Sequence, residues 1–423
     1  MATQRIAIVG AGQAAAQAVE TLHKRAHQGS LTLIGDESLL PYQRPPLSKK
    51  FLAGTLDRDR LLIRHSAHYI DHGVDLRLGF AVVNVDRVRR RVEIADGSAV
   101  EYDALLLATG SHPRLLPLPG ADLAGVHYLR SVADVDRLRG ELSPGRRAVI
   151  IGGGYIGLEV AATCREAGLD VTVLEAADRV MNRVVSPAVS AFYEAEHASR
   201  GVRILCGARV DELVPGPIEV RSPDEVSSVA RPGTEHVAAV RLEDGHEVPA
   251  DFVLVAIGVA PTDALARAAG LDCDNGILVD EYCRTSDPHI WAAGDCARHP
   301  SIHYGTRVRL ESVDNAFEQG ASAALNMLGI RTVHDKVPWF WSDQFDLKMV
   351  IVGLSAAHDE VVLRGDPASR AFSVCYLRDG ELIAVETVNH TKDQMAARKL
   401  IPVRARPDLA KLSDPALPLK DCF

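Results

Sequence analysis

IAIVGAGQAA, residues 6–15, is the stretch that decides how the chain begins to fold. Its first four residues predict a short buried strand, and the rest match the G-x-G-x-x-G/A turn that leads from a strand into a helix. Gly10 permits the tight turn, Gly12 leaves room for phosphate oxygens, and Ala15 is small enough for close helix packing. Since backbone N–H groups and the helix dipole attract an anion there, the stretch predicts a dinucleotide site.

The same pattern occurs a second time. Residues 147–151 predict a strand, GGGYIG at 152–157 is a complete G-x-G-x-x-G, and residues 158–167 continue as a helix. One such match is weak evidence, because a glycine-rich turn can serve only to make the bend. Two complete units in one chain favour two dinucleotide sites and an α/β fold.

Each unit ends in an acidic residue at the position where ribose hydroxyls are held. Asp36 follows the second strand of the first unit, where a solvated turn acid is the alternative, and Glu175 ends the second unit. A carboxylate at Glu175 accepts hydrogen bonds from both ribose hydroxyls and repels a 2′-phosphate, so NAD(H) is favoured over NADP(H). Arg179 lies nearby in sequence and could pair with such a phosphate. The economical pair for two sites is FAD in the first unit and NAD(H) in the second.

Other stretches suggest walls for these sites. LPYQRPPLSK, residues 40–49, is stiffened by prolines and brings Arg44 and Lys49 close to the first turn. Three apolar strands end in small residues that allow close approach to a ligand, at Thr109-Gly110, Ile257-Gly258 and Gly294-Asp295. Asp295 could bind the ribityl chain of a flavin or simply cap a helix.

Composition limits the class of protein. A chain of 423 residues is expected to form two or three domains, and a net charge of −9 disfavours a nucleic-acid binder. No apolar run approaches the roughly 20 residues of a membrane span, and the sequence enters its first strand at once. We therefore expect a cytoplasmic protein without a membrane segment.

Cysteine and histidine usage bears on redox and metal chemistry. The seven cysteines form no C-x-x-C pattern and none precedes Cys164, which favours reduced thiols and leaves residues 36–60 without a redox cysteine. His65, His68 and His72 have helical spacing that could suit a metal, but no cysteine or acidic pair completes a site. We expect a solvated helix face and no metal.

These motifs together resemble the FAD-dependent NADH:ferredoxin reductases of oxygenase systems, of the putidaredoxin reductase type. The resemblance rests on both glycine turns, RPPLSK at 44–49, the three strand ends in small residues and Glu159. It covers essentially the whole chain. It implies a glutathione reductase-type fold with two Rossmann-like dinucleotide-binding domains, for FAD and NAD, and a C-terminal α+β domain. The expected ranges are 1–112 and 249–328 for FAD, 113–248 for NAD and 329–423 for the last domain.

The resemblance also implies roles for single residues. Lys49 would lie near flavin N5 and face Glu159, Pro45 and Pro46 would wall the flavin ring, and Trp341 would lie at its partner-facing edge. Lys49, Glu159 and Trp341 are the expected catalytic residues. The full set expected to bind cofactors is Gly10, Gly12, Ala15, Asp36, Arg44, Pro46, Lys49, Val82, Ala108, Thr109, Gly110, Gly152, Gly154, Tyr155, Ile156, Gly157, Glu159, Glu175, Ile257, Gly258, Gly294, Asp295 and Trp341.

The implied partner is an acidic [2Fe–2S] ferredoxin, which would dock on a local basic patch with Arg309, Lys392 and Arg398 as candidates. The protein would be a monomer or weak dimer. Two alternatives stay open: a rubredoxin- or nitrite reductase-type electron donor, and a non-enzymatic flavoprotein switch that binds NADH. The irregular stretch between Glu196 and Gly245 is expected to be a variable part of the second domain.

Overall fold

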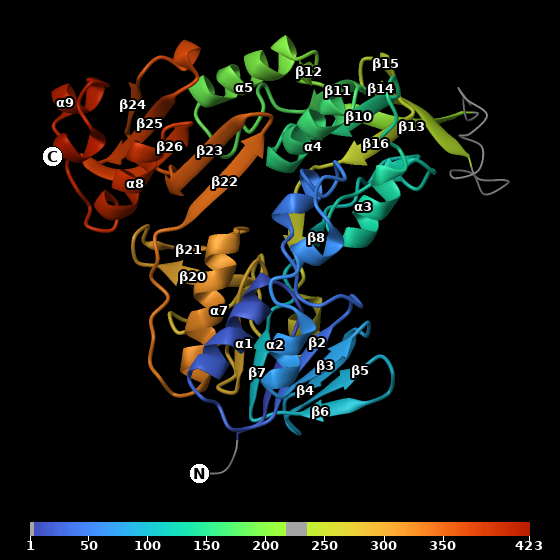
Figure 1. Ribbon diagram of the computed structural model, residues 1–423, viewed down its shortest axis with the longest axis vertical. Helices are drawn as coiled ribbons and strands as arrows, with labels where there is room; N and C mark the ends of the chain where they lie inside the picture. The colour runs from blue at the N-terminus through green and yellow to red at the C-terminus, as the bar shows by residue number, and fades with distance from the viewer. Residues whose placement is uncertain (1–3, 217–234) are drawn as a thin grey trace.

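The computed structural model describes residues 4–216 and 235–423, and three parts meet at its centre (Figure 1). The first unit lies at the bottom of the view, the second at the upper right, and the C-terminal domain at the upper left. The fold class expected from the sequence is confirmed.

The first unit is a five-stranded parallel sheet in the order β19-β7-β1-β2-β3. Four of these strands are buried along their whole length, as strands covered on both faces must be. Helices α1 (Gln13–Lys24) and α7 (Val313–Met327) lie side by side on one face (Figure 1). The strands are β1 Ile6–Val9, β2 Leu31–Gly35, β3 Val74–Leu78, β7 Ala104–Leu107 and β19 Ile290–Ala292.

The second unit repeats this design with the parallel order β12-β11-β10-β16-β9. Its glycine turn leads into α4 (Tyr155–Glu166), and α5 (Pro187–Ser199) begins after a Ser186 cap. The strands are β9 Val126–His127, β10 Arg147–Ile151, β11 Asp170–Glu175, β12 Arg203–Cys206 and β16 Phe252–Val255.

Strand β16 corrects the expected division of the chain. Residues 249–328 were expected to return to the first unit, but β16 pairs with β10 in the second sheet. It holds the place beside the central strand that β7 holds in the first sheet, so both strands share one pattern of apolar residues followed by small ones. Residue 249 is therefore too early for the return to the first unit.

The C-terminal domain is an antiparallel sheet in the order β22-β23-β26-β25-β24, with α8 and α9 packed against it. The sheet shares a hydrophobic core with the second unit, where the rings of Phe192 and Phe372 lie 5.1 Å apart. The elements are β22 Trp339–Gln344, β23 Leu347–Gly353, β24 Glu360–Arg364, β25 Phe372–Arg378, β26 Glu381–Val388, α8 Thr391–Leu400 and α9 Leu409–Ser413.

The remaining elements are short and connect or cover these sheets. They are α2 Ser66–Asp71, α3 Val132–Arg139, α6 Ala264–Ala268, β4 Val82–Asp86, β5 Arg91–Ile94, β6 Ala99–Glu101, β8 Ser111–Pro113, β13 Val210–Gly216, β14 His236–Leu242, β15 Glu247–Pro249, β17 Val259–Pro261, β18 Ile277–Leu278, β20 Ala297–Ser301 and β21 Thr306–Val308. The stretch between Glu196 and Gly245, expected to be irregular, thus contains three strands around residues 217–234, which lie outside the described residues, as do residues 1–3.

The histidines of the first unit form a small cluster on α1 and α2. The ring of His72 lies 3.3 Å from that of His23 and 4.4 Å from that of His68, while His65 is exposed before α2. The helical spacing indicated His68 and His72 but gave no sign of His23. Within the described part of the chain, no group of three or more histidines, cysteines or acids could hold a metal ion. Among the same residues, no helix has the length and apolar character to cross a bilayer.

Candidate active site

A cavity of about 650 Å³ lies where the three parts meet. Its floor is the first glycine turn, and its walls come from loop 44–49, the start of α4 and strand β22. The predicted residues that line it are Gly10, Gly12, Asp36, Arg44, Lys49, Ala108, Thr109, Gly110, Tyr155, Ile156, Glu159, Gly294, Asp295 and Trp341.

The first glycine turn is shaped by close backbone approach. A Cβ atom at Gly10, where φ is +104°, would lie 2.1 Å from the carbonyl oxygen of Ala108. At Gly12 a Cβ would meet nothing within 4 Å, so this position opens into the cavity at the beginning of α1. The buried methyl of Ala15 packs inside the unit and does not line the cavity.

Two acids follow β2, and they are held differently. The Glu37 carboxylate accepts hydrogen bonds from Tyr42 Oη at 2.6 Å and from Arg44 at 2.7 Å. Asp36 is exposed at the cavity, and its Oδ1 accepts a hydrogen bond from the Glu37 backbone N–H at 3.0 Å. Asp36 is therefore the more available of the two acids for a ribose.

The Asp295 carboxylate is tied to two neighbours. Its Oδ2 accepts hydrogen bonds from Ser111 Oγ at 2.7 Å and from the Arg130 guanidinium at 3.2 Å. Burial lowers the pKa of Arg130, but the carboxylate favours its charged form. Arg130 belongs to no motif in the sequence, so only the structure reveals that it joins Arg44 at the cavity.

The structure brings Lys49 and Glu159 into contact at the cavity wall. Lys49 Nζ lies 2.5 Å from Glu159 Oε2, and Ser48 Oγ donates to the same oxygen at 2.6 Å. Ser342 Oγ donates to the other oxygen, Oε1, at 2.6 Å. The Glu159 side chain is only 5% exposed, so this carboxylate is held by a dedicated set of donors. Ser48 lies inside RPPLSK at 44–49 and Ser342 follows the predicted Trp341, but neither role could be read from the sequence.

Aromatic rings close the cavity on the C-terminal side. Phe340 and Trp341 of β22 both line it, and the Phe340 ring packs 4.5 Å from that of Tyr155 at the start of α4. Trp341 is half-buried and lies 5.3 Å from Trp339, centroid to centroid. Burial raises the pKa of Tyr155 well above its ordinary value, so its hydroxyl stays neutral.

The second glycine turn has the same backbone design. A Cβ at Gly152 would lie 2.5 Å from the Ala256 carbonyl oxygen, whereas one at Gly154 would meet nothing within 4 Å. Glu175 Oε2 accepts a hydrogen bond from the Gly153 N–H at 2.7 Å. Arg179, which could have paired with a 2′-phosphate, instead donates to the Val185 carbonyl and to two other acceptors, Ser190 Oγ and the Asn182 carbonyl.

Several predicted cofactor residues lie away from this cavity. Val82 is in β4, a strand of a separate antiparallel sheet, and Pro46 lies inside a short 3₁₀ turn behind Pro45. The residues of the second turn and its surroundings that do not line it are Gly152, Gly154, Gly157, Glu175, Ile257 and Gly258. Direct cofactor contact by these residues stays a prediction.

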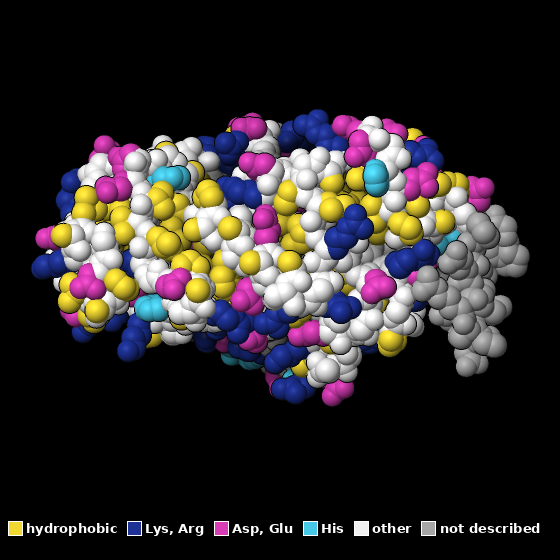
Figure 2. Space-filling view, turned by 90° about the horizontal axis from the view of Figure 1, so that it is seen from above, with side chains coloured by type: hydrophobic (Ala, Val, Ile, Leu, Met, Phe, Trp, Pro, Cys, Tyr) yellow, Lys and Arg dark blue, Asp and Glu magenta, His cyan; other side chains and the backbone are white. Residues whose placement is uncertain are grey.

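One docking candidate is wrong. The Arg309 side chain is 8% exposed and is held by the Asp295 carbonyl at 3.1 Å and Glu311 at 2.6 Å, so it cannot form part of an open basic patch. Lys392 and Arg398 are exposed on α8. On the upper face of the second unit and the C-terminal domain, basic and acidic side chains lie among hydrophobic ones (Figure 2).

The residues present fit a flavin dinucleotide at the first turn. Gly12 leaves an opening beside the N-terminus of α1, and Arg44 and Arg130 place positive charge at the cavity wall, which would attract a pyrophosphate. Asp36 and Asp295 offer acceptors for hydroxyl groups. The cavity walls supplied by Pro45, Tyr155 and Trp341 suit a flat ring system.

Comparison with known families and structures agrees with this geometry. The family model described as "Pyridine nucleotide-disulphide oxidoreductase" matches residues 4–320, and the "Reductase C-terminal" model matches residues 339–423. The chain belongs to the pyridine nucleotide-disulphide oxidoreductase family.

Individual relatives cover nearly the whole chain. The rhodocoxin reductase of Rhodococcus erythropolis is 43% identical over 94% of this chain and 89% of its own length. The putidaredoxin reductase of Pseudomonas putida is 40% identical over 99% of this chain and 97% of its own. The crystal structure of a covalent putidaredoxin reductase–putidaredoxin complex matches with a TM-score of 0.92 at 40% identity, over 100% of this chain and 98% of that one.

Proposed function

We propose that this protein oxidises NADH and passes the electrons through bound FAD to a [2Fe–2S] ferredoxin that serves a monooxygenase or dioxygenase. The observation that carries the proposal is one cavity that joins the first glycine turn, the Lys49–Glu159 pair and Trp341. Relatives named as ferredoxin–NAD(+) reductase components of the anthranilate and biphenyl dioxygenase systems support it, at 41% and 37% identity.

FAD, when bound, takes up two electrons at once from a reduced nicotinamide and gives them up singly. The chain contributes position and charge. Lys49 holds a positive charge at the cavity wall, where it favours a neighbouring anionic ring, and Glu159 fixes the direction of the ammonium group. The Tyr155 and Phe340 rings pack together at the cavity wall nearest the second turn, where a nicotinamide would meet them.

The second turn supports NADH as the preferred donor. Glu175 lies at the turn itself through its bond to the Gly153 N–H, where it would meet an adenine ribose. The guanidinium of Arg179 is engaged by three acceptors and is not directed to a 2′-phosphate. Both features favour NADH over NADPH.

The ferredoxin would dock over α8 and β22. The Arg398 guanidinium lies 3.8 Å from the centre of the Trp339 ring, Trp339 packs against Trp341, and Trp341 lines the cavity. Exposed cations on this route, including Lys392, would attract an acidic partner, while the indoles provide short contact between the protein surface and the cavity.

One assay tests the proposal. The purified protein is expected to be yellow, to bleach with NADH and poorly with NADPH, and to reduce cytochrome c quickly only when a [2Fe–2S] ferredoxin is added. Arg398→Glu should slow ferredoxin reduction about tenfold at low salt and leave bleaching by NADH unchanged. Arg203→Glu, an exposed arginine of β12, is the matched control. A protein that binds no flavin after incubation with FAD would refute the proposal.

A further inference from the structure

A buried hydrogen-bond chain runs away from the cavity behind Glu159. Ser342 Oγ donates to Glu159 Oε1 at 2.6 Å, Gln344 Nε2 donates to Ser342 Oγ at 3.2 Å, and His197 Nε2 lies 2.9 Å from Gln344 Oε1. Ser342, Gln344 and His197 are each fully buried. These three side chains form a relay that ends at the Glu159 carboxylate.

The direction of every bond in the relay is fixed by chemistry. An ionised Glu159 can only accept, so the Ser342 hydroxyl must donate to it and must accept from the amide group of Gln344. The amide oxygen of Gln344 can only accept a hydrogen bond, so His197 must carry a proton on Nε2 and donate it. All three donors thus point toward the Glu159 carboxylate.

The histidine is suited to this direction. Burial lowers the pKa of His197, which keeps the imidazole neutral, and a neutral ring with a proton on Nε2 leaves Nδ1 as an acceptor. Nδ1 is buried and has no hydrogen-bond partner among the described residues. Since hydrogen bonds in series polarise one another, the relay strengthens the bond that Ser342 makes to the carboxylate.

The relay also joins all three parts of the molecule at one carboxylate. His197 comes from α5 and Glu159 from α4 of the second unit, Ser342 and Gln344 come from β22 of the C-terminal domain, and Lys49 comes from the first unit. Ser342 and Gln344 are two residues apart on the strand, so their side chains share the face turned to the second unit.

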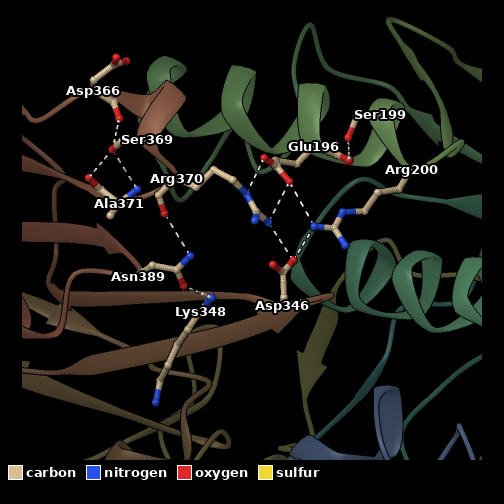
Figure 3. Close-up of polar contacts among 10 residues, drawn as sticks. All are labelled: Glu196, Ser199, Arg200, Asp346, Lys348, Asp366, Ser369, Arg370, Ala371 and Asn389. Carbon is tan, nitrogen blue, oxygen red and sulfur yellow. Dashed lines mark hydrogen bonds and ion pairs between the residues drawn. The ribbon is translucent and has the colours of Figure 1, made fainter.

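A charged cluster holds the outer end of the relay in place (Figure 3). Arg370 contacts Glu196 at 3.0 Å and Asp346 at 2.8 Å, and Arg200 binds the same two carboxylates. Glu196 adjoins the histidine of the relay, and Asp346 lies two residues beyond its glutamine. The cluster therefore fixes α5 against the end of β22, which keeps the histidine within reach of the amide.

We infer that His197, Gln344 and Ser342 are positioning residues that fix Glu159, and through it the Lys49 ammonium, at the site of electron uptake; this rests on the proposed function. When the relay is intact, Glu159 Oε1 has its own donor and the carboxylate shares its charge between both oxygens. When the relay is broken at Ser342, Glu159 Oε1 loses its donor. When the relay is broken at His197, the Ser342 hydroxyl still donates to that oxygen, but the bond loses the polarisation that the histidine supplied. In both cases the carboxylate draws the Lys49 ammonium away from the cavity.

Two substitutions of His197 separate this role from packing. His197→Phe keeps a ring but removes the donor, and His197→Gln retains an N–H donor near the position of Nε2. On FAD-loaded protein, His197→Phe should shift the flavin midpoint potential to more negative values and slow single-turnover reduction by NADH about tenfold. His197→Gln should restore both within about twofold of wild type, by the same principle. FAD content and far-UV circular dichroism check that each variant is folded.

Ser342→Ala provides a second variant, since it breaks the relay next to the carboxylate without touching α5. It should shift the potential and the rate in the same direction as His197→Phe and at least as far, because it removes the donor to Glu159 itself. A wild-type potential and rate in both His197→Phe and Ser342→Ala would overturn the inference, as would equal losses in His197→Phe and His197→Gln. Failure of the proposed function looks different, because wild-type protein would then not be reduced by NADH at all.

Discussion

The two glycine turns of this protein have the same backbone and different surroundings. In each, the first glycine lies against a carbonyl oxygen, of Ala108 in the first unit and Ala256 in the second, where a Cβ would come within 2.1 Å and 2.5 Å. In each, the second glycine opens into free space. Ala108 follows β7 and Ala256 follows β16, and these strands occupy equivalent places in the two sheets. The two turns therefore make the same backbone contact.

The surroundings separate the two sites. The first turn is the floor of a cavity walled by all three parts of the molecule, with Arg44 and Arg130 beside it. Among the described residues, the second turn and the start of α4 contribute Tyr155, Ile156 and Glu159 to that cavity, and Ile156 is 40% exposed. One backbone motif can thus serve a retained cofactor and an exchanging one, because enclosure rather than the turn decides how easily a ligand leaves.

The largest expected effect comes from valine at the two open glycines. Gly12→Val and Gly154→Val both fit the extended backbone there, and the new side chain would fill the space of a pyrophosphate. Gly12→Val should be colourless, whereas Gly154→Val should stay yellow and bind NADH about a hundredfold more weakly. Flavin absorbance and NADH titration measure these outcomes. Loss of FAD in Gly154→Val would show that the sites are not separate.

A buried carboxyl group links the second unit to the C-terminal sheet, and the stability that it contributes depends on pH. Glu386 of β26 accepts a hydrogen bond from the Ser186 N–H at 3.1 Å, beside Tyr376, and burial raises its pKa to about 7. Because the pKa of Glu386 in the folded protein lies above its ordinary value of 4.5, the protonated carboxyl group favours the folded state. Its contribution to the free energy of unfolding is complete below pH 4.5 and is lost as the pH rises through 7.

Glu386→Gln should remove that dependence. Relative to the variant, wild type should lose about 2–3 kcal/mol of unfolding free energy between pH 5 and pH 8. Urea denaturation of both proteins at each pH measures the difference. A constant difference across this range would contradict a buried, protonated Glu386.

Glu175→Ala tests the acid at the second turn. The carboxylate that would meet the ribose hydroxyls is lost, so NADH binding should weaken about tenfold while NADPH binding does not. The ratio of kcat/KM for the two nucleotides reports the change, and FAD content should stay at the wild-type level. Unchanged discrimination would exclude a ribose role for Glu175.

The smallest expected effect is at the third position of the first turn. Ala15→Gly removes a buried methyl and loosens α1, which should lower stability by about 1 kcal/mol without loss of FAD. Thermal unfolding and flavin absorbance measure the two quantities. A colourless Ala15→Gly would mean that this methyl supports the cofactor directly.

The sequence predicted the fold class and much of the cavity wall, because both depend on local signals. A glycine turn after an apolar strand, an acid at the next strand end and small residues at a later strand end are short-range patterns. The residues that they indicated, Gly10, Gly12, Asp36 and Asp295, line one cavity. The same reasoning misplaced β16, since equivalent strands of two similar sheets carry the same pattern.

Residues without a local pattern could not be found in this way. Arg130, Ser342 and His197 are ordinary in sequence, and each gains its role from a partner more than 100 residues away or in another domain. The burial of Arg309 was hidden for the same reason, because exposure is a property of the packed molecule.

By itself, then, the sequence predicted that two units would each bind a dinucleotide, because the residues of a glycine turn set its backbone geometry. Only the tertiary structure decided that the first turn is enclosed and that Ser48 and Ser342 hold the Glu159 carboxylate against Lys49. Those features depend on side chains from three parts of the chain packing into one place, and the energy of such contacts belongs to no single stretch of sequence.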